Sequence, residues 1–380
     1  MRNRFIISTA ARGAVALAIA ALTTLPVAAQ TATKANAQAS AVPRLPDGHP
    51  DLNGVYDLAT MTPLERLPGD PPVLSKEQAE KIQQAELARR TADHGQLDPN
   101  RPRLPAGGDT TPGKTFFEIL EKAGGGAVGG YDRLWLNQGR AYTVVDGQIR
   151  TSIVIDPPNG HVPPFNAGAR KRQSSARALP TSDQAENPDT KAPPRRGEYD
   201  DPEQRPLSER CLLGFGSTSG PPALPDYFYN DLHQIVQTPD SVMILSEMIH
   251  DARIVRMNAQ HLPKNFRFWM GDSVGHWEGD TLVVDTTNFN DKTRFRGATE
   301  NLHVVERFTR TGPRTLLYRF IIEDPATWTR PWTGEFTWPA TDAHIYEYAC
   351  HEANYALKDI LKGARLRDQE QAGHSDLNKK

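Results

Sequence analysis

The feature that most constrains the fold is a succession of short apolar runs in the C-terminal half of the chain. Between Asp231 and Leu361 these runs recur at roughly ten-residue spacing, with turn residues and no helical period between them. The runs are 235–237, 242–245, 254–255, 266–277, 281–285, 302–309, 315–322, 332–338 and 345–350. Such a series predicts an antiparallel meander that closes as a barrel or folds as a sandwich.

The predicted fold class is mainly β, with a lipocalin- or calycin-like barrel or a sandwich flanked by one N-terminal and one C-terminal helix. The N-terminal helix starts after Ser75, which with Gln78 has the pattern of a capping box. The C-terminal helix is expected over 355–366. Asp146-Gly147 lies between two apolar runs and predicts a hairpin before the main series.

The composition indicates that only part of the 380 residues is packed core. The chain is 38% hydrophobic and holds 31 Pro and 29 Gly, which concentrate outside the apolar runs. We therefore expect one β unit with additions. The expected segments are a signal peptide (1–29), a disordered leader (30–44), an N-terminal element with helix and hairpin packed on the main unit (45–165), a disordered Pro-rich and charged insert (166–209), a β-barrel-like domain (210–366) and a flexible tail (367–380).

The start of the chain has the composition of a secretory signal peptide. Three arginines accompany an almost unbroken apolar run over 13–25, and Ala29 ends a small-residue cleavage pattern. The run is shorter than the ~20 apolar residues that a membrane anchor needs. We expect cleavage after Ala29, or else after Ala37, with no integral membrane segment and a periplasmic or secreted product.

The net charge of the chain limits the classes of partner that it can bind. The 44 basic and 46 acidic residues give a net charge of −2, which excludes a dedicated nucleic-acid binder because phosphate recognition needs a basic excess. The expected partner is a small-molecule ligand or substrate.

In an oxidising compartment the two cysteines predict one disulfide between Cys211 and Cys350. The alternative is a nucleophilic or metal-bound thiolate, which only the neighbouring His351 favours.

The sequence contains no nucleotide loop, zinc-protease helix, serine-hydrolase elbow or calcium loop. The catalytic candidates are therefore taken from the alternation of side chains along each strand, which places every second residue on the same face. Glu306 interrupts the apolar face of the run 302–308, and Glu247 interrupts that of 243–249. Arg253 lies on the apolar face of its own strand and is available as a partner. A carboxylate on an apolar face pairs with a cation or rises in pKa, and active sites use both. The alternatives are a structural Glu–Arg pair or a pleat shifted by one residue.

Histidines and aromatic residues supply further candidates. His250 and His276 lie near strand ends, where a barrel mouth gathers side chains. The histidines do not show the sequence spacing that is typical of metal ligands, so no metal site is predicted. Aromatic side chains either fill the core or line a pocket for a flat, partly apolar ligand. The candidates for such a pocket are Trp269, Trp277, Trp332 and Tyr348.

Four segments resemble a large family of exported bacterial proteins: 49–56 (His-Pro-Asp-Leu-Asn-Gly-Val-Tyr), 235–239, 271–286 and 302–308. The Trp-Glu-Gly-Asp-Thr-Leu block within 271–286 is the most specific of these matches. The chain departs from the family pattern after Cys211. The resemblance implies a signal peptide, export and one β-rich folded unit, and it assigns no activity, cofactor or catalytic residue.

Together these features predict a secreted enzyme, a hydrolase or lyase, that applies acid/base chemistry to a small carbohydrate-type or phenolic molecule. Glu306 or Glu247 is the expected base or acid, His250 or His276 assists proton transfer, and Arg253 orients an anionic or carbonyl oxygen. The alternatives are a non-catalytic lipocalin-like binding protein and a structural envelope protein without a pocket. The cofactor is unknown at this stage.

Overall fold

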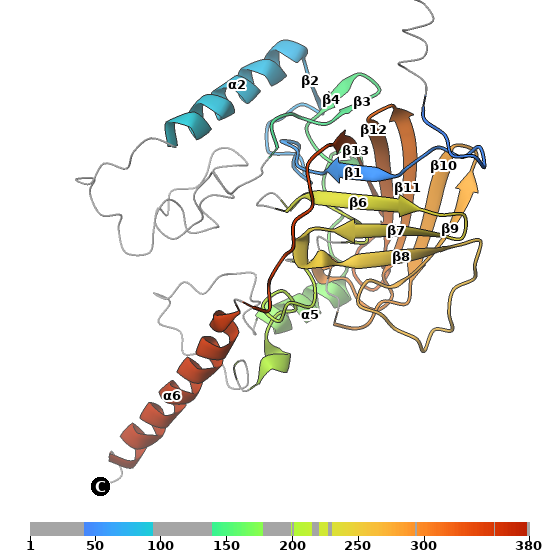
Figure 1. The fold of residues 1–380 in the computed structure, drawn as a ribbon. Helices are drawn as coiled ribbons and strands as arrows, with labels where there is room; N and C mark the ends of the chain where they lie inside the picture. The colour runs from blue at the N-terminus through green and yellow to red at the C-terminus, as the bar shows by residue number, and fades with distance from the viewer. Residues whose placement is uncertain are drawn as a thin grey trace, which may run out of the picture. The chain divides into compact units, whose positions relative to one another are not determined.

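The computed structural model describes residues 42–93, 139–177, 199, 201–214, 220–226, 230–292, 295–352 and 354–377. The expected signal peptide and most of the expected leader lie outside these residues, as do 178–198 of the charged insert. Val42–Lys380 forms one compact unit. The centre of this unit is a β-barrel (Figure 1).

Nine strands form a closed, mixed barrel (Figure 1). They are β1 (Gly54–Asp57), β6 (Leu232–Gln237), β7 (Ser241–Ser246), β8 (Ala252–Met257), β9 (Asp272–Glu278), β10 (Thr281–Thr287), β11 (His303–Gly312), β12 (Thr315–Glu323) and β13 (Trp332–Thr341). Each strand pairs with the next in this order, and β1 pairs with β13 to close the ring. The predicted mainly β class and the barrel are therefore confirmed.

The prediction of a purely antiparallel meander is wrong at one place. β8 and β9 pair in parallel, through Val255 opposite Ser273 and Met257 opposite Gly275. Parallel neighbours need a connection that returns the chain to the same end of the sheet. The loop 258–271 makes this connection here, so the expected long strand 266–277 begins only at Asp272.

The barrel is closed by a strand from far earlier in the chain. β1 lies between β6 and β13, with Val55 opposite Gln234 on one side and Thr341 on the other. A short strand β5 (Val154–Asp156) also pairs with β13, at Thr333 and Gly334. The barrel is thus not confined to 210–366, since the segment predicted as an N-terminal addition supplies an integral strand.

Smaller elements surround the barrel. A three-stranded sheet contains β2 (Val73–Leu74), β4 (Gln148–Arg150) and β3 (Val144–Val145), and the predicted Asp146-Gly147 hairpin joins β3 to β4 with positive φ at both turn residues. The helices are α2 (Lys76–Asp93), α5 (Ala167–Arg177) and α6 (Tyr355–Leu377), with 3₁₀ turns at Pro202–Gln204, Met248–His250 and Phe295–Gly297. Within the described parts of the chain, no helix combines the length and apolar character needed to cross a bilayer.

One of these helices, and the second half of another, lie where the sequence predicted a disordered or flexible segment. α5 occupies the start of the charged insert, where Asn166 Oδ1 accepts the N–H of Ala169 and Arg172 donates to the carbonyl of Ala326. α6 continues through most of the expected tail. Before α2, the predicted capping box is present, because Ser75 Oγ accepts the Gln78 N–H and Gln78 Oε1 accepts the Ser75 N–H.

Alternate residues of the barrel strands fill its interior. Inward positions on β11, β12 and β13 are fully enclosed, and many are aromatic: Phe308, Tyr318, Phe320, Trp332, Phe336 and Trp338. Trp332, a predicted pocket residue, is buried and packs edge to face against the buried Trp328. Trp332 is therefore a core residue and does not line a ligand pocket as predicted.

The predicted disulfide is present. Cys211 and Cys350 are joined, with their Cα atoms 5.9 Å apart. The run 345–350 that leads to Cys350 is not a strand, because β13 ends at Thr341 and the chain then runs without strand pairing. The disulfide therefore ties the segment before β6 to the segment after the last strand.

Gly334 on β13 provides a test of this packing. It lies opposite Phe320, and a Cβ at Gly334 would fall 2.1 Å from the Phe320 ring. We expect Gly334→Ala to lower the free energy of unfolding by about 1–3 kcal/mol through overpacking. Urea unfolding measures this, with Gly312→Ala as the matched control because a methyl group at Gly312 would have no neighbouring atom within 4 Å. Equal effects of the two changes would contradict the packing described.

Candidate functional site

Arg253 and Glu306, both predicted as site residues, meet inside the barrel. Arg253 Nη2 donates to Glu306 Oε1 at 2.8 Å and Nη1 donates to Oε2 at 2.5 Å. The two side chains are 4% and 0% exposed. A bidentate guanidinium–carboxylate pair of this kind is both strong and directional. The parity predicted for β8 and β11 therefore agrees with the structure.

The ion pair extends into a hydrogen-bonded network. Tyr318 on β12 donates its hydroxyl proton to Glu306 Oε1 at 2.8 Å, and the same hydroxyl accepts the backbone N–H of Ala223 at 3.0 Å. Burial raises the pKa of Tyr318 well above its usual value, so the phenol stays protonated. The segment 220–226 is thereby attached to the barrel interior through Ala223, which has no exposed surface.

The other predicted catalytic residues do not join this network. Glu247 is buried, but it follows β7, and its Oε1 accepts the backbone N–H of Tyr346. His250 is exposed and its Nδ1 lies 3.2 Å from the Tyr348 carbonyl oxygen. His276 is on the outer surface, 51% exposed, and pairs with Glu278. The structure thus assembles two of the five predicted residues.

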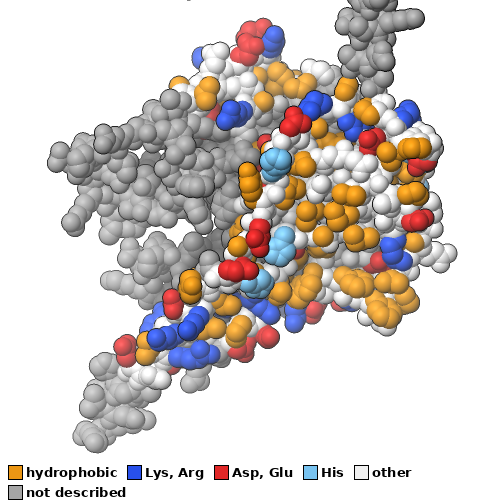
Figure 2. Space-filling view, viewed as in Figure 1, with side chains coloured by type: hydrophobic (Ala, Val, Ile, Leu, Met, Phe, Trp, Pro, Cys, Tyr) orange, Lys and Arg blue, Asp and Glu red, His pale blue; other side chains and the backbone are white. Residues whose placement is uncertain are grey.

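The prediction of which β7 residues point into the barrel is wrong by one position. Val242, Ile244 and Ser246 point inward, whereas Met243 and Leu245 are on the outer side. The outer side of β6–β8 carries apolar side chains, including Val236 and Ile254, which are 37% and 52% exposed (Figure 2). Because both faces of β7 carry apolar residues, the sequence does not show which face points into the barrel. This explains why Glu247 was assigned to the wrong face.

The predicted ligand-binding aromatic residues do not form one pocket. Trp277 stacks on His49 with ring centroids 4.5 Å apart. Tyr348 is half-buried in the segment that follows β13, and Trp269 is half-buried in the loop before β9. Together with the core position of Trp332, these locations give no common surface for a flat ligand.

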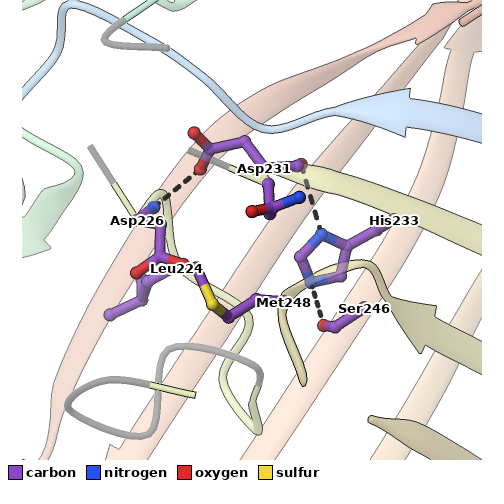
Figure 3. Close-up of a pocket in the computed structure, with 7 residues that line it drawn as sticks. Leu224, Asp226, Asp231, His233, Ser246 and Met248 are labelled. Carbon is purple, nitrogen blue, oxygen red and sulfur yellow. Dashed lines mark hydrogen bonds between the residues drawn. The ribbon is translucent and has the colours of Figure 1, made fainter. Parts of the chain in front are cut away.

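A group that the sequence did not single out lies at the end of the barrel where β6 begins and β7 ends. His233 on β6 is directly opposite Ser246 on β7, and Ser246 Oγ lies 2.6 Å from His233 Nε2 (Figure 3). His233 Nδ1 is 3.3 Å from the backbone oxygen of Asp231. All three residues are at most 3% exposed. A histidine and a serine therefore form a buried hydrogen-bonded pair.

The partners of His233 determine its tautomer. A carbonyl oxygen can only accept, so Nδ1 carries the proton and donates to Asp231. Nε2 then has the free electron pair and accepts the proton of the Ser246 hydroxyl. Burial lowers the pKa of His233 to about 4, so the ring is neutral at pH 7.

The carboxyl group of Asp231 completes this group. Its Oδ1 accepts the N–H of Asp226 at 2.7 Å, whereas its Oδ2 is buried without a hydrogen-bond partner among the described residues. Burial, reinforced by the nearby charge of Asp226, raises the pKa of Asp231 well above its usual value. The carboxyl group therefore favours its protonated form, which donates a hydrogen bond.

These side chains line a small hollow (Figure 3). Its walls are Leu224, Asp226, Asn230, Asp231, His233, Ser246 and Met248. It has no room for a whole water molecule as it stands. The hollow as it stands therefore has no space for a bound molecule, and Met248 is its most adaptable wall residue because methionine is unbranched and flexible.

One weak signal for this group is present in the sequence. His233 alternates with Ile235, and Ser246 alternates with Ile244, so correct parity places both polar side chains inside an apolar barrel. Their pairing depends on the β6–β7 register, which the turn at 238–240 determines.

A second polar cluster lies on the outer side of the barrel. His261 reaches Asp285 Oδ1 through Nε2 at 2.9 Å and Asp272 Oδ2 through Nδ1 at 3.2 Å. His303 Nε2 lies 3.0 Å from Asp285 Oδ2, and its Nδ1 is 3.7 Å from Glu323. The hydrogen bond to Asp285 raises the pKa of His303, which favours its protonated form. Across the described residues, no three histidine, cysteine or acidic side chains are arranged to hold a metal ion.

The interior ion pair predicts a large effect of removing one charge. We expect Glu306→Gln to lower the free energy of unfolding by about 3–5 kcal/mol, because Arg253 stays buried without its counter-charge. Urea unfolding at pH 7 measures this. The double variant Arg253→Met, Glu306→Leu removes both charges and should recover most of the loss. A double variant as unstable as Glu306→Gln would contradict this explanation.

The outer cluster predicts a dependence of stability on pH. The hydrogen bond to Asp285 raises the pKa of His303, so the folded state binds this proton more tightly than the unfolded state. Protonated His303 contributes its full stabilisation below the unfolded-state pKa of about 6.5, and this stabilisation is lost as pH rises through the folded-state pKa. We expect His303→Gln to destabilise by less than about 1 kcal/mol at pH 6, since the pair is partly exposed, and by less again at pH 9. Urea unfolding at both pH values measures the change, and a deficit that grows with pH would contradict it. His276→Gln is the control.

Comparison of the chain with protein-family models, with curated proteins and with solved structures finds no match. These comparisons assign no family and no activity. The functional proposal therefore depends on the contacts of the barrel-end group, Asp231, His233 and Ser246, and of the interior network around Glu306.

Proposed function

We propose that the protein is an exported enzyme that performs acid/base chemistry on a small carbohydrate-type or phenolic molecule at the end of the barrel. The observation that carries the proposal is the juxtaposition of His233, Ser246 and Asp231 around one buried hollow. The two residues with perturbed pKa values differ in their roles. His233 offers a free electron pair, and Asp231 offers a proton.

Such a pair suits general acid/base catalysis, which needs a proton donor and a proton acceptor held within reach of the same substrate. Environments that push neighbouring pKa values in opposite directions are characteristic of catalytic groups. Here burial favours the neutral form of the histidine and the protonated form of the carboxyl group. Export rests on the signal peptide expected at 1–29 and is consistent with the Cys211–Cys350 disulfide.

In this proposal the interior network positions the site and is not itself reactive. Glu306 is fully enclosed and its carboxylate is engaged by Arg253 and Tyr318. The roles of acid and base therefore move from Glu306 and Glu247 to Asp231 and His233. Trp338 packs against both His233 and Tyr318, with ring centroids 5.6 and 4.5 Å apart, and connects the two groups.

A second candidate function is non-catalytic binding of a small molecule. It is favoured by the small size of the hollow, which has no room for a water molecule as a second reactant. The same residues would then recognise the ligand without converting it.

A ligand panel separates the two functions. We expect a phenolic or carbohydrate compound to raise the melting temperature, because a ligand at 100 Kd adds about 2.7 kcal/mol of stability, and to be converted to a product seen by mass spectrometry. His233→Gln should then lower turnover at least 10²-fold through loss of the proton acceptor.

The control is His276→Gln, an exposed change on the outer surface that should leave both readouts as in the wild type. Binding without conversion would favour the carrier. Conversion that survives His233→Gln would contradict the assignment of the site.

A further inference from the structure

We propose that Ser246 is the nucleophile of an acyl-transfer reaction on small esters, with His233 as its base. This inference rests on the proposed function and adds to it the atom that attacks and the bond that is broken. It applies to an ester of a small alcohol or phenol, whose acyl carbon is reached by a serine oxygen.

The geometry of the pair is that of an activated nucleophile. The Ser246 hydroxyl points at the unprotonated Nε2 of His233 across 2.6 Å, and the other ring nitrogen is held by the Asp231 carbonyl oxygen at 3.3 Å. Nucleophile, base and an orienting third group are the features by which such sites are recognised, whatever their order in the chain. The β6–β7 register, with His233 directly opposite Ser246, holds the two side chains on rigid strands.

Asp231 supplies what an acyl-transfer site needs besides a nucleophile. A tetrahedral intermediate carries a negative oxygen, which hydrogen-bond donors in a water-free site stabilise. The Oδ2 atom of Asp231 is buried and has no hydrogen-bond partner among the described residues, and Asp231 and Ser246 both line the hollow. The Asp231 carboxyl group points toward Asp226 in the resting structure (Figure 3), so it reaches that negative oxygen as a proton donor after its side chain rotates. A buried polar atom without a partner is unusual in a folded protein, and the oxygen of the intermediate would supply the partner that Oδ2 lacks.

The wall of the hollow selects for a small acyl group. Leu224 and Met248 provide an apolar side for a short alkyl chain, and Asp226 and Asn230 provide a polar side for the alcohol part of the ester. The hollow is tight, so the acyl group must displace the Met248 side chain on entry. Large acyl chains are excluded by the aromatic core beneath, where Trp338 and Tyr318 are fully buried.

The reaction balances with water as the second reactant. Ser246 Oγ bonds to the acyl carbon while its proton moves to His233 Nε2. The bond from carbon to the alcohol oxygen then breaks, and the leaving oxygen takes the proton from Nε2. In the second half, water gives a proton to Nε2 and bonds to the acyl carbon, and Ser246 Oγ leaves with that proton.

Covalent labelling tests the nucleophile directly. Diisopropyl fluorophosphate forms a phosphorus–oxygen bond with an activated serine and releases fluoride. We expect the full folded chain to acquire one diisopropylphosphoryl group, located by peptide mass spectrometry on Ser246. No adduct on the wild type, or an adduct on another residue, would overturn the proposal without any variant being made.

Two variants and one control define the mechanism. Ser246→Ala keeps the side chain small and should abolish labelling, and His233→Gln should slow it at least 10²-fold. Ser241→Ala is the matched control, because Ser241 starts the same strand but lies at its exposed end, bonded to Thr238. Its labelling should equal that of the wild type. Labelling that persists in Ser246→Ala would overturn the proposal.

The outcome separates this inference from the proposed function. If Ser246 stays unlabelled while a panel compound is still converted in a His233-dependent manner, acid/base chemistry stands and the nucleophile is wrong. If Ser246 is labelled and p-nitrophenyl acetate is hydrolysed with loss in Ser246→Ala, both stand. If neither labelling nor conversion occurs, both fail.

Discussion

The enclosed pair of Arg253 and Glu306 is the interaction on which the polar network of the barrel interior depends. Taking two charges out of water is expensive, and only good geometry with further hydrogen bonds compensates for it. The barrel supplies that geometry by placing the two residues on β8 and β11 and by adding the Tyr318 hydroxyl from β12. Because that hydroxyl also holds the Ala223 backbone, the network connects the wall of the barrel to the segment that leads to the candidate site.

The candidate site follows from this arrangement. The barrel interior below it is filled by aromatic side chains and by a neutralised charge pair, so water is excluded from that side. A histidine and a carboxyl group at such a boundary lose hydration, and both favour their neutral forms. The neutral forms are the ones that an acid/base pair needs, so the packing of the barrel and the proposed chemistry have the same physical origin.

Much of the fold could be predicted from the sequence, because apolar period and turn residues are local signals. The β11 parity that placed Glu306 inside was correct, and Asp146-Gly147 made the predicted hairpin. The pairing of strands that are distant in the sequence could not be predicted. Neither the parallel contact of β8 with β9 nor the closure by β1 leaves a mark in the sequence. The His233–Ser246 pair depends on register in the same way, so the reactive candidates predicted from single strands were incomplete.

The state of the His233 ring tests the central claim most directly. Long-range proton–nitrogen NMR spectra of the imidazole, assigned with His233→Gln, report which nitrogen carries the proton at each pH. The claim predicts a ring protonated on Nδ1 with a bare Nε2, neutral from about pH 8 to about pH 5, since burial lowers its pKa to about 4. Protonation on Nε2, or a titration centred near 6.5 as for an exposed histidine, would contradict it.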